Sequence, residues 1–250
     1  MERQNILITG ASSGLGMEMA KQFAAKGRNL ALCARRVERL EALKATLEQQ
    51  HPGVKVLVKS LDVNDHDQVF EVFKAFEAEF DGGIDRVIVN AGMGKGASLG
   101  TGYFEANKQT AITNFVSAIA QCEAALELFR AKDNGHLVTI SSVSAVRGFR
   151  RALTVYAATK AALSNLTEGI RVDLLGTNIK ASCIHPGFIR SEINEKVDKV
   201  PFMVDTDIGV AAMVKAIEAE KPNAYVPGWP WAYMRHILRW APLKSLRGMS

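Results

Sequence analysis

A tyrosine and a lysine one helical turn apart are the strongest candidates for chemistry in this sequence. Tyr156 and Lys160 lie in a helix-length segment, and a spacing of four residues puts both side chains on one helix face. A phenol has an ordinary pKa of about 10, and a nearby ammonium group lowers it by stabilising the phenolate. The pair indicates acid–base catalysis, although the same spacing also occurs on many surface helices. Ser142, at the end of an upstream predicted strand, would add a hydroxyl nearby.

A glycine-rich turn follows the first predicted strand and opens a predicted helix. It reads Thr9-Gly10-Ala11-Ser12-Ser13-Gly14-Leu15-Gly16. Glycines allow a tight turn, let backbone N–H groups approach a phosphate, and aim a helix N-terminus at negative charge. The turn therefore predicts a dinucleotide site. The alternative is an ordinary strand-to-helix turn, since the spacing differs from G-x-G-x-x-G.

The end of the second predicted strand bears on the choice of nucleotide. Ala34, Arg35 and Arg36 stand where an NAD site usually has a carboxylate for the ribose 2′-hydroxyl. Cations at this place suit a 2′-phosphate, and the hydroxyls of Ser12 and Ser13 could add contacts. The sequence favours NADP(H), with a solvated surface pair of arginines as the alternative.

Short apolar runs alternate with helix-length segments along the chain. The predicted strands lie near 6–9, 29–34, 54–61, 86–90, 136–141, 179–184 and 224–226. The predicted helices lie near 15–26, 36–50, 65–80, 104–131, 155–177 and 207–220. This alternation predicts an α/β fold with one parallel sheet and helices on both faces. Ligands in such folds bind at the carboxyl ends of the strands, where the motifs above lie.

Composition indicates one soluble globular domain over residues 1–250, with 48% hydrophobic and 23% charged residues. No apolar run approaches the ~18 residues of a membrane span, and the N-terminus enters a predicted strand at once, so we expect a cytoplasmic protein. The cysteines, Cys33, Cys122 and Cys183, are odd in number and lie in apolar segments, which indicates reduced core thiols. We expect no metal site, because His185, near the proposed site, has no ligand partner at metal spacing.

The net charge of +5 is concentrated at one end of the chain. Residues 221–250 hold five Lys or Arg and no Asp or Glu, whereas the rest of the chain has equal numbers of both signs. The body carries no basic stripe interleaved with stacking aromatics, so we expect no nucleic-acid partner.

Seven motifs in order resemble the short-chain dehydrogenase/reductase family over residues 5–226. They are T-G-x-x-x-G-x-G at 9–16, Asp62-Val63, Asn90-Ala91-Gly92, Asn114, Ser142, Tyr156/Lys160 and Pro186-Gly187. The resemblance implies a Rossmann-type doubly wound parallel sheet of about seven strands in a three-layer α-β-α sandwich. It also implies a homodimer or homotetramer.

The resemblance assigns roles to the matching residues. Tyr156 would donate a proton to a carbonyl oxygen, Lys160 would lower its pKa, Ser142 would bind the substrate oxygen, and Asn114 would hold a water. Asp62 and Val63 would contact adenine, Asn90 the ribose, and Ile189 and Ser191 the carboxamide. The full cofactor set is Gly10, Ser12, Ser13, Gly14, Leu15, Gly16, Arg35, Arg36, Asp62, Val63, Asn90, Ala91, Gly92, Tyr156, Lys160, Pro186, Gly187, Ile189 and Ser191.

The sequence also departs from the family pattern. Val89 stands where many members have Asn, and Ser191 where Thr is usual. The gap of 14 residues from Ser142 to Tyr156 is one longer than the commonest spacing. Either the loop bulges or Ser141 supplies the hydroxyl, and Ser142 is our choice.

Two segments are candidates for contact with the substrate. We expect residues 188–207 to form an apolar lid, or else only to pack on the body, and glycines at 92–102 to make the opposite wall mobile. The extension 228–250 is basic and holds all three tryptophans. It could lie on an anionic membrane. Pro227, Pro230 and Pro242 break any long helix, however, so we favour packing on the protein.

We therefore predict an NADPH-dependent oxidoreductase that reduces a ketone to a secondary alcohol, reversibly. The expected substrate is hydrophobic or of 3-oxoacyl type, and could be linked to an acidic carrier attracted by Arg147, Arg150 and Arg151. One alternative is a non-catalytic NADP(H)-binding sensor or scaffold, but a relic of that kind would be expected to have lost Tyr156 or Lys160. The other is a peripheral membrane protein that acts through its C-terminal segment.

Overall fold

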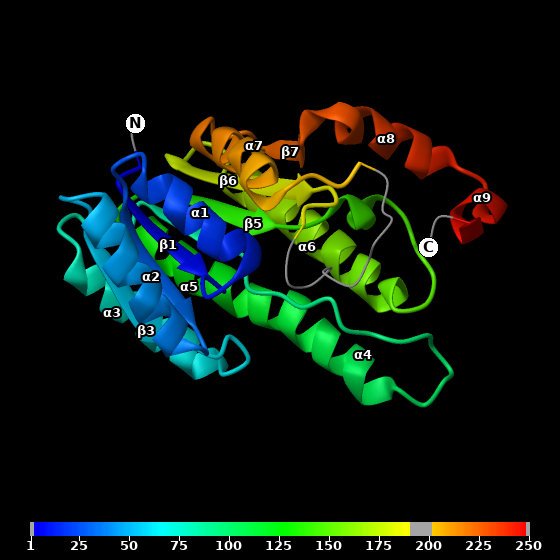
Figure 1. The fold of residues 1–250 in the computed structure, drawn as a ribbon, viewed down its shortest axis with the longest axis horizontal. Coiled ribbons are helices and arrows are strands. Elements are labelled where there is room, and N and C mark those ends of the chain that lie inside the picture. Colours follow the sequence, from blue (N-terminus) through cyan, green and yellow to red (C-terminus); the bar gives the residue numbers. More distant parts are fainter. Residues whose placement is uncertain (1–2, 191–201, 249–250) are drawn as a thin grey trace.

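A computed structural model describes residues 3–190 and 202–248, which form one parallel sheet with helices on both faces (Figure 1). The strand order is β3-β2-β1-β4-β5-β6-β7. The strands are β1 (Asn5–Thr9), β2 (Asn29–Ala34), β3 (Val56–Ser60), β4 (Arg86–Val89), β5 (Gly135–Ile140), β6 (Ile179–Pro186) and β7 (Asn223–Val226). The helices are α1 (Gly14–Ala24), α2 (Val37–Gln50), α3 (His66–Glu79), α4 (Phe104–Ala111), α5 (Ser117–Ala131), α6 (Leu153–Asp173), α7 (Thr206–Glu218), α8 (Gly228–Trp240) and α9 (Leu243–Gly248). The predicted fold class is confirmed.

Alternation along the strands builds two cores, one on each face of the sheet. Ile6 and Ile8 of β1 point to the face covered by α1, α2 and α7, while Leu7 points to the face covered by α3, α5 and α6. Because both faces are buried, the strands are almost wholly apolar. Cys33, Cys122 and Cys183 are buried and free, as predicted.

The strand order fixes where a ligand can approach. The chain winds outward through β1, β2 and β3 and then crosses back to pair β4 with β1. This reversal is the switch point at which open α/β sheets bind ligands, at the carboxyl ends of the strands. The turns after β1 and β4 therefore meet at one edge, and they carry the glycine motif and Asn90.

The prediction of one continuous helix over 104–131 is wrong in one respect. A π-helical turn, η1 (Ile112–Val116), separates α4 from α5. Such turns add one residue to the helical repeat and are common at functional sites. A second short element, the 3-10 turn η2 (Val143–Val146), follows β5 and was not predicted.

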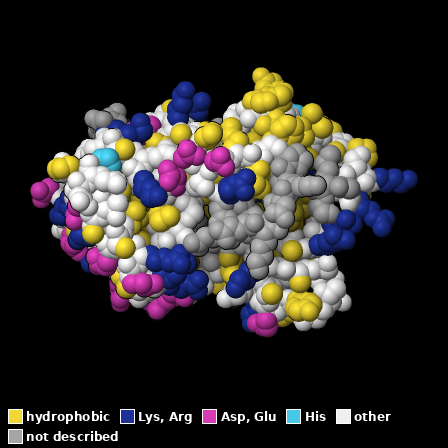
Figure 2. Space-filling model, viewed as in Figure 1, with side chains coloured by type: hydrophobic (Ala, Val, Ile, Leu, Met, Phe, Trp, Pro, Cys, Tyr) yellow, Lys and Arg dark blue, Asp and Glu magenta, His cyan; other side chains and the backbone are white. Residues whose placement is uncertain are grey.

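The C-terminal extension is more helical than its prolines suggested. Pro230 lies in the first turn of α8, where a missing N–H costs little, and Pro242 lies beyond its end. Trp231, Leu238 and Leu246 are buried on the body, so packing on the protein is confirmed for one face. Hydrophobic side chains of the other face gather along the upper edge of the molecule (Figure 2).

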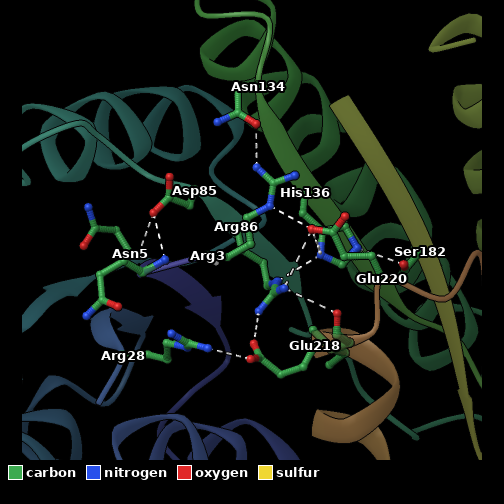
Figure 3. A network of polar contacts seen from close by, with 12 residues as sticks. Arg3, Asn5, Arg28, Asp85, Arg86, Asn134, His136, Ser182, Glu218 and Glu220 are labelled. Atoms are coloured by element: carbon green, nitrogen blue, oxygen red, sulfur yellow. Dashed lines mark hydrogen bonds and ion pairs between the residues drawn. The ribbon is translucent and has the colours of Figure 1, made fainter. Parts of the chain in front are cut away.

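A cluster of buried polar and charged side chains lies at the opposite edge of the sheet, at the amino ends of the strands (Figure 3). Arg86 is 1% exposed, forms an ion pair with Glu218, and donates from Nε to Nδ1 of His136 at 2.9 Å. His136 Nε2 lies 2.8 Å from the Ser182 hydroxyl. Burial, followed by the charge of Arg86, lowers the pKa of His136 well below its ordinary value, so the imidazole is neutral.

No helix within residues 3–190 and 202–248 has both the length and the apolar character needed to cross a bilayer. The lid predicted at 188–207 falls largely on residues 191–201, outside the described residues, and its role is not tested. The single-domain assignment likewise stays a prediction.

Candidate active site

The turn after β1 requires glycine at Gly10, Gly14 and Gly16. Gly10 and Gly14 have φ of +66° and +53°, a left-handed conformation that favours glycine. A Cβ on Gly16 would collide with the Gly10 carbonyl and lie 2.7 Å from Asn90 Nδ2. The helix α1 therefore begins in close contact with the end of β4, and its N-terminus opens at the ligand edge.

Hydrogen bonds join this turn to the segment after β4. The Thr9 hydroxyl accepts from the backbone N–H groups of Asn90 and Ala91, both at 3.0 Å. Asn90 Nδ2 donates to the carbonyls of Thr9 at 2.9 Å and Gly10 at 3.4 Å. Thr9 and Asn90 therefore tie the glycine turn to the segment after β4, and the predicted contact of Asn90 with the ribose stays a prediction.

The two arginines after β2 differ in their surroundings. Arg36 donates to the hydroxyl of Ser13 at 2.7 Å and to that of Ser12 at 3.3 Å. Arg35 is exposed. One cation and two hydroxyls thus gather beside the glycine turn, at the strand end where a nucleotide site recognises the ribose 2′ position.

The segment after β3 lies at the same sheet edge. Asp62 accepts from the backbone N–H of Asn64 at 3.0 Å, which closes a tight turn. Val63 is buried. The contact of both residues with adenine stays a prediction.

Tyr156 and Lys160 share one face of α6, as the spacing predicts. Lys160 Nζ lies 5.9 Å from the centre of the Tyr156 ring and donates to the Ile140 carbonyl at 2.8 Å. Burial lowers the pKa of Lys160 to about 8. Burial raises the pKa of Tyr156, and a hydrogen bond with Ser142 opposes that rise. The predicted lowering of the tyrosine pKa by Lys160 stays a prediction.

Ser141 and Ser142 differ in their hydrogen bonds. The Ser141 hydroxyl donates to the Lys160 carbonyl at 2.9 Å and lies 2.7 Å from the Ser164 hydroxyl, so it serves the packing of α6. The Ser142 hydroxyl accepts from the Ser144 backbone N–H at 3.1 Å and acts to lower the pKa of Tyr156. This geometry favours Ser142 as the acting hydroxyl.

Asn114 lies in η1 and is 1% exposed. Its Oδ1 accepts from the Met93 backbone N–H at 2.8 Å, and its Nδ2 donates to the Met93 carbonyl at 2.9 Å. A Cβ on Gly92 would lie 3.2 Å from Asn114 Oδ1 and 3.5 Å from Lys160 Nζ. The segment after β4 thus runs between these two side chains.

The segment 92–102, which we expected to form a mobile wall of the site, is anchored at its start. Besides the Asn114 contacts with Met93, Asn107 exchanges hydrogen bonds with both backbone groups of Ala97, at 3.0 and 3.2 Å. The Thr110 hydroxyl donates to the Lys95 carbonyl. Residues 93–97 are therefore held by α4 and η1. No sequence pattern indicated these contacts, because short polar side chains in a helix have many other uses.

The end of β6 holds the last part of the site. Gly187 donates to the Val226 carbonyl at 2.8 Å, and a Cβ there would run into the Trp231 indole, which covers it. The Ile189 side chain packs in the core against Gly209 of α7. The contact of Ile189 with a nicotinamide carboxamide stays a prediction, and Ser191 lies outside the described residues.

Comparison with known proteins agrees with this geometry. The model of the short chain dehydrogenase family matches residues 4–201. An uncharacterized oxidoreductase of Mycobacterium tuberculosis is 50% identical over 98% of this chain and 96% of its own length. A farnesol dehydrogenase of Aedes aegypti is 34% identical over 75% of this chain and 78% of its own.

Solved structures share the fold. A short-chain dehydrogenase from Sphingobium yanoikuyae, in complex with NADPH, has a TM-score of 0.82 at 27% identity and covers 98% of this chain and 95% of its own. Other structures of this fold carry 5-hydroxy-NADP or NAD. From the family model and the relatives, this chain belongs to the short-chain dehydrogenase/reductase family of oxidoreductases.

Proposed function

We propose that this protein is an NADP(H)-dependent oxidoreductase that reduces a ketone to a secondary alcohol, reversibly. The observation that carries the proposal is the placement of the buried Lys160 Nζ 5.9 Å from the centre of the Tyr156 ring on one face of α6, with Ser142 near the phenol. A hydroxyl pair of this kind can donate to an oxygen on which negative charge grows.

The residues present fit a nicotinamide dinucleotide. The Gly10–Gly16 turn leaves no room for side chains beside the N-terminus of α1, as a site for a pyrophosphate requires. Arg36, held by Ser12 and Ser13, and the exposed Arg35 would meet a 2′-phosphate. When bound, the cofactor supplies the hydride.

The side chains of the site would donate the proton and bind the substrate oxygen. Tyr156 donates its proton to the carbonyl oxygen, and Ser142 donates a hydrogen bond to the same oxygen. Lys160, whose pKa of about 8 lies close to neutral pH, supplies positive charge beside the phenol as it gives up its proton. Asn114 is a positioning residue, since its side chain is engaged with the Met93 backbone.

An apolar substrate is supported by the aromatic side chains next to Gly187. The ring of Phe188 meets Trp231 edge-on at 5.3 Å, and Phe202, 52% exposed, lies 6.3 Å from the same indole. The farnesol dehydrogenase relative agrees with a hydrophobic alcohol or ketone. A 3-oxoacyl thioester on a carrier is the other form of substrate that we propose. A cytoplasmic location and a homodimer or homotetramer stay predictions.

The test is turnover of a panel of hydrophobic ketones and acyl thioesters, followed by oxidation of NADPH. Tyr156→Phe should lower kcat by about 10² to 10⁴-fold, the usual contribution of a general acid, and leave NADPH binding unchanged. Tyr103→Phe is the matched control, because Tyr103 is 63% exposed and precedes α4. A near-normal rate in Tyr156→Phe contradicts the proposal.

Cofactor choice is tested separately by binding. Arg36→Ala should weaken NADPH about 10- to 100-fold, the value of a charge-assisted hydrogen bond to phosphate, and NADH much less. Equal losses of affinity for NADPH and NADH would contradict the proposal that Arg36 binds the 2′-phosphate.

A further inference from the structure

The C-terminal extension exposes a row of large apolar side chains that its own fold does not use. They are Trp229 at 73%, Tyr233 at 65%, Ile237 at 58%, Trp240 at 81% and Leu243 at 74% exposed. Within α8, Tyr233, Ile237 and Trp240 recur at spacings of four and three residues, which places them on one helix face. Trp229 extends this exposed row, since its ring meets Tyr233 edge-on at 5.6 Å.

The opposite face of the same helix is already occupied. Trp231 covers Gly187 and packs on Phe188, while Leu238 and Leu246 pack with Val146 of η2. Arg147 also donates to the Arg239 carbonyl. Because these contacts fix α8 to the body, the exposed row is presented outward by a rigid support.

Positive charge flanks the exposed row on the side of α9 (Figure 2). Residues 221–250 hold five Lys or Arg and no acidic residue. Lys and Arg side chains project near α9, beyond the hydrophobic patch (Figure 2). Arg150 and Arg247 line a groove of about 350 Å³ together with Phe149, Leu243 and Leu246. The segment thus presents exposed aromatic and aliphatic side chains with basic side chains nearby (Figure 2).

We propose that the exposed row of α8 docks on an anionic lipid bilayer, with the helix in the plane of the surface. Tyr and Trp favour the membrane–water interface, and an amphipathic helix flanked by Lys and Arg is attracted by acidic headgroups. A second copy of the chain fits less well, since a two-fold contact would bring together two C-terminal segments that each hold five Lys or Arg and no acidic residue. The helix does not span the bilayer.

Docking in this way would bring the site close to the lipid. The inner face of α8 touches Gly187 at the end of β6, and the η2 turn on which α9 packs directly follows Ser142. An apolar substrate dissolved in the membrane would then enter over a short path. This consequence rests on the proposed function, whereas docking itself is measured without any substrate.

Vesicle co-sedimentation of the full chain tests the docking. We expect binding to vesicles of phosphatidylcholine with phosphatidylglycerol, weaker binding to phosphatidylcholine alone, and loss of binding as salt is added. All three tryptophans lie in this extension, so intrinsic fluorescence reports the same event. In Trp231→Phe, the two remaining indoles are exposed, and their emission should shift to the blue on binding.

Variants separate the contributions of the row and of the charge. Trp229→Gln with Trp240→Gln should lower the affinity for acidic vesicles at least tenfold. Arg239→Gln with Lys244→Gln should lower it by about fivefold for each charge removed. Leu175→Gln is the matched control, since Leu175 is 78% exposed beyond the C-terminal end of α6, and it should bind as the unaltered chain does.

Three outcomes would overturn the proposal. They are no binding to acidic vesicles, equal losses in the tryptophan and Leu175 variants, and a change from oligomer to monomer in the tryptophan variant when the unaltered chain does not bind vesicles. The last would show that the row is a subunit interface. Turnover plays no part in these measurements, so a failed ketone assay leaves the docking result intact.

Discussion

His136 should make this protein sensitive to mild acid, and His136→Gln should remove that sensitivity. The imidazole is fully buried, accepts from Arg86 through Nδ1, and lies against Ser182 through Nε2. Because Nδ1 accepts, Nε2 carries the proton and donates to the serine. A glutamine can accept from Arg86 with its oxygen and donate to Ser182 with its amide, but it cannot be protonated near neutral pH.

The direction of the effect follows from the lowered pKa of His136. In the unfolded chain, histidine takes up a proton below its ordinary pKa of about 6.5, while the folded protein keeps the imidazole neutral. The unfolded state therefore binds more protons as the pH falls, and folding stability decreases. The slope approaches about 1.4 kcal/mol per pH unit, which amounts to roughly 2 kcal/mol between about pH 7.5 and about pH 5.

The assay is urea unfolding followed by far-UV circular dichroism at both pH values. The unaltered protein should lose about 2 kcal/mol more of its unfolding free energy on acidification than His136→Gln does. Glu218, whose pKa is lowered by Arg28 and Arg86 against the effect of burial, loses its contribution only at lower pH, and does so in both proteins. His236→Gln is the matched control, because His236 is exposed on α8.

Equal pH dependence in the unaltered protein and in His136→Gln would refute this reasoning. It would mean that His136 is protonated in the folded state and has lost its bond from Arg86, because a guanidinium cannot accept a hydrogen bond, and that the buried cation is balanced differently.

Three further changes test packing at the two ligand-facing turns and at one helix cap. Gly16→Ala should weaken dinucleotide binding at least tenfold with the fold retained, since the added Cβ strikes the Gly10 carbonyl; calorimetric titration with NADPH measures it. Gly187→Ala should expel the Trp231 indole, shift tryptophan emission to the red, and cost about 1 to 3 kcal/mol of stability. Asp65→Ala removes the side-chain cap of α3 and should cost about 1 kcal/mol in chemical denaturation, with turnover unchanged.

Much of the architecture is determined by local sequence. The apolar strands, the glycine turn and the helix-length segments between them predict a parallel α/β sheet, and the predicted strand bounds agree with the structure to within a few residues. Tyr156 and Lys160 share a helix face because the spacing of four residues alone requires it. These features depend on neighbours in the chain, so no tertiary contact is needed to predict them.

Other features depend on contacts between distant segments. No sequence pattern predicts the π-helical turn at Asn114, because the turn positions Asn114 for hydrogen bonds with the backbone of Met93, a distant residue. Ser141 and Ser142 are adjacent and chemically alike, and only the packing of α6 against β5 assigns one to structure and the other to Tyr156.

In the C-terminal extension, too, the sequence determines some features and the tertiary structure determines others. Its composition alone revealed the concentration of tryptophan and positive charge, but not which side chains would be buried. The tertiary structure decided that Trp231 packs on Gly187 while Trp229 and Trp240 face outward. The physical reason is that burial is settled by the surface a helix lies against, and that surface is built from β6 and η2, far away in the sequence.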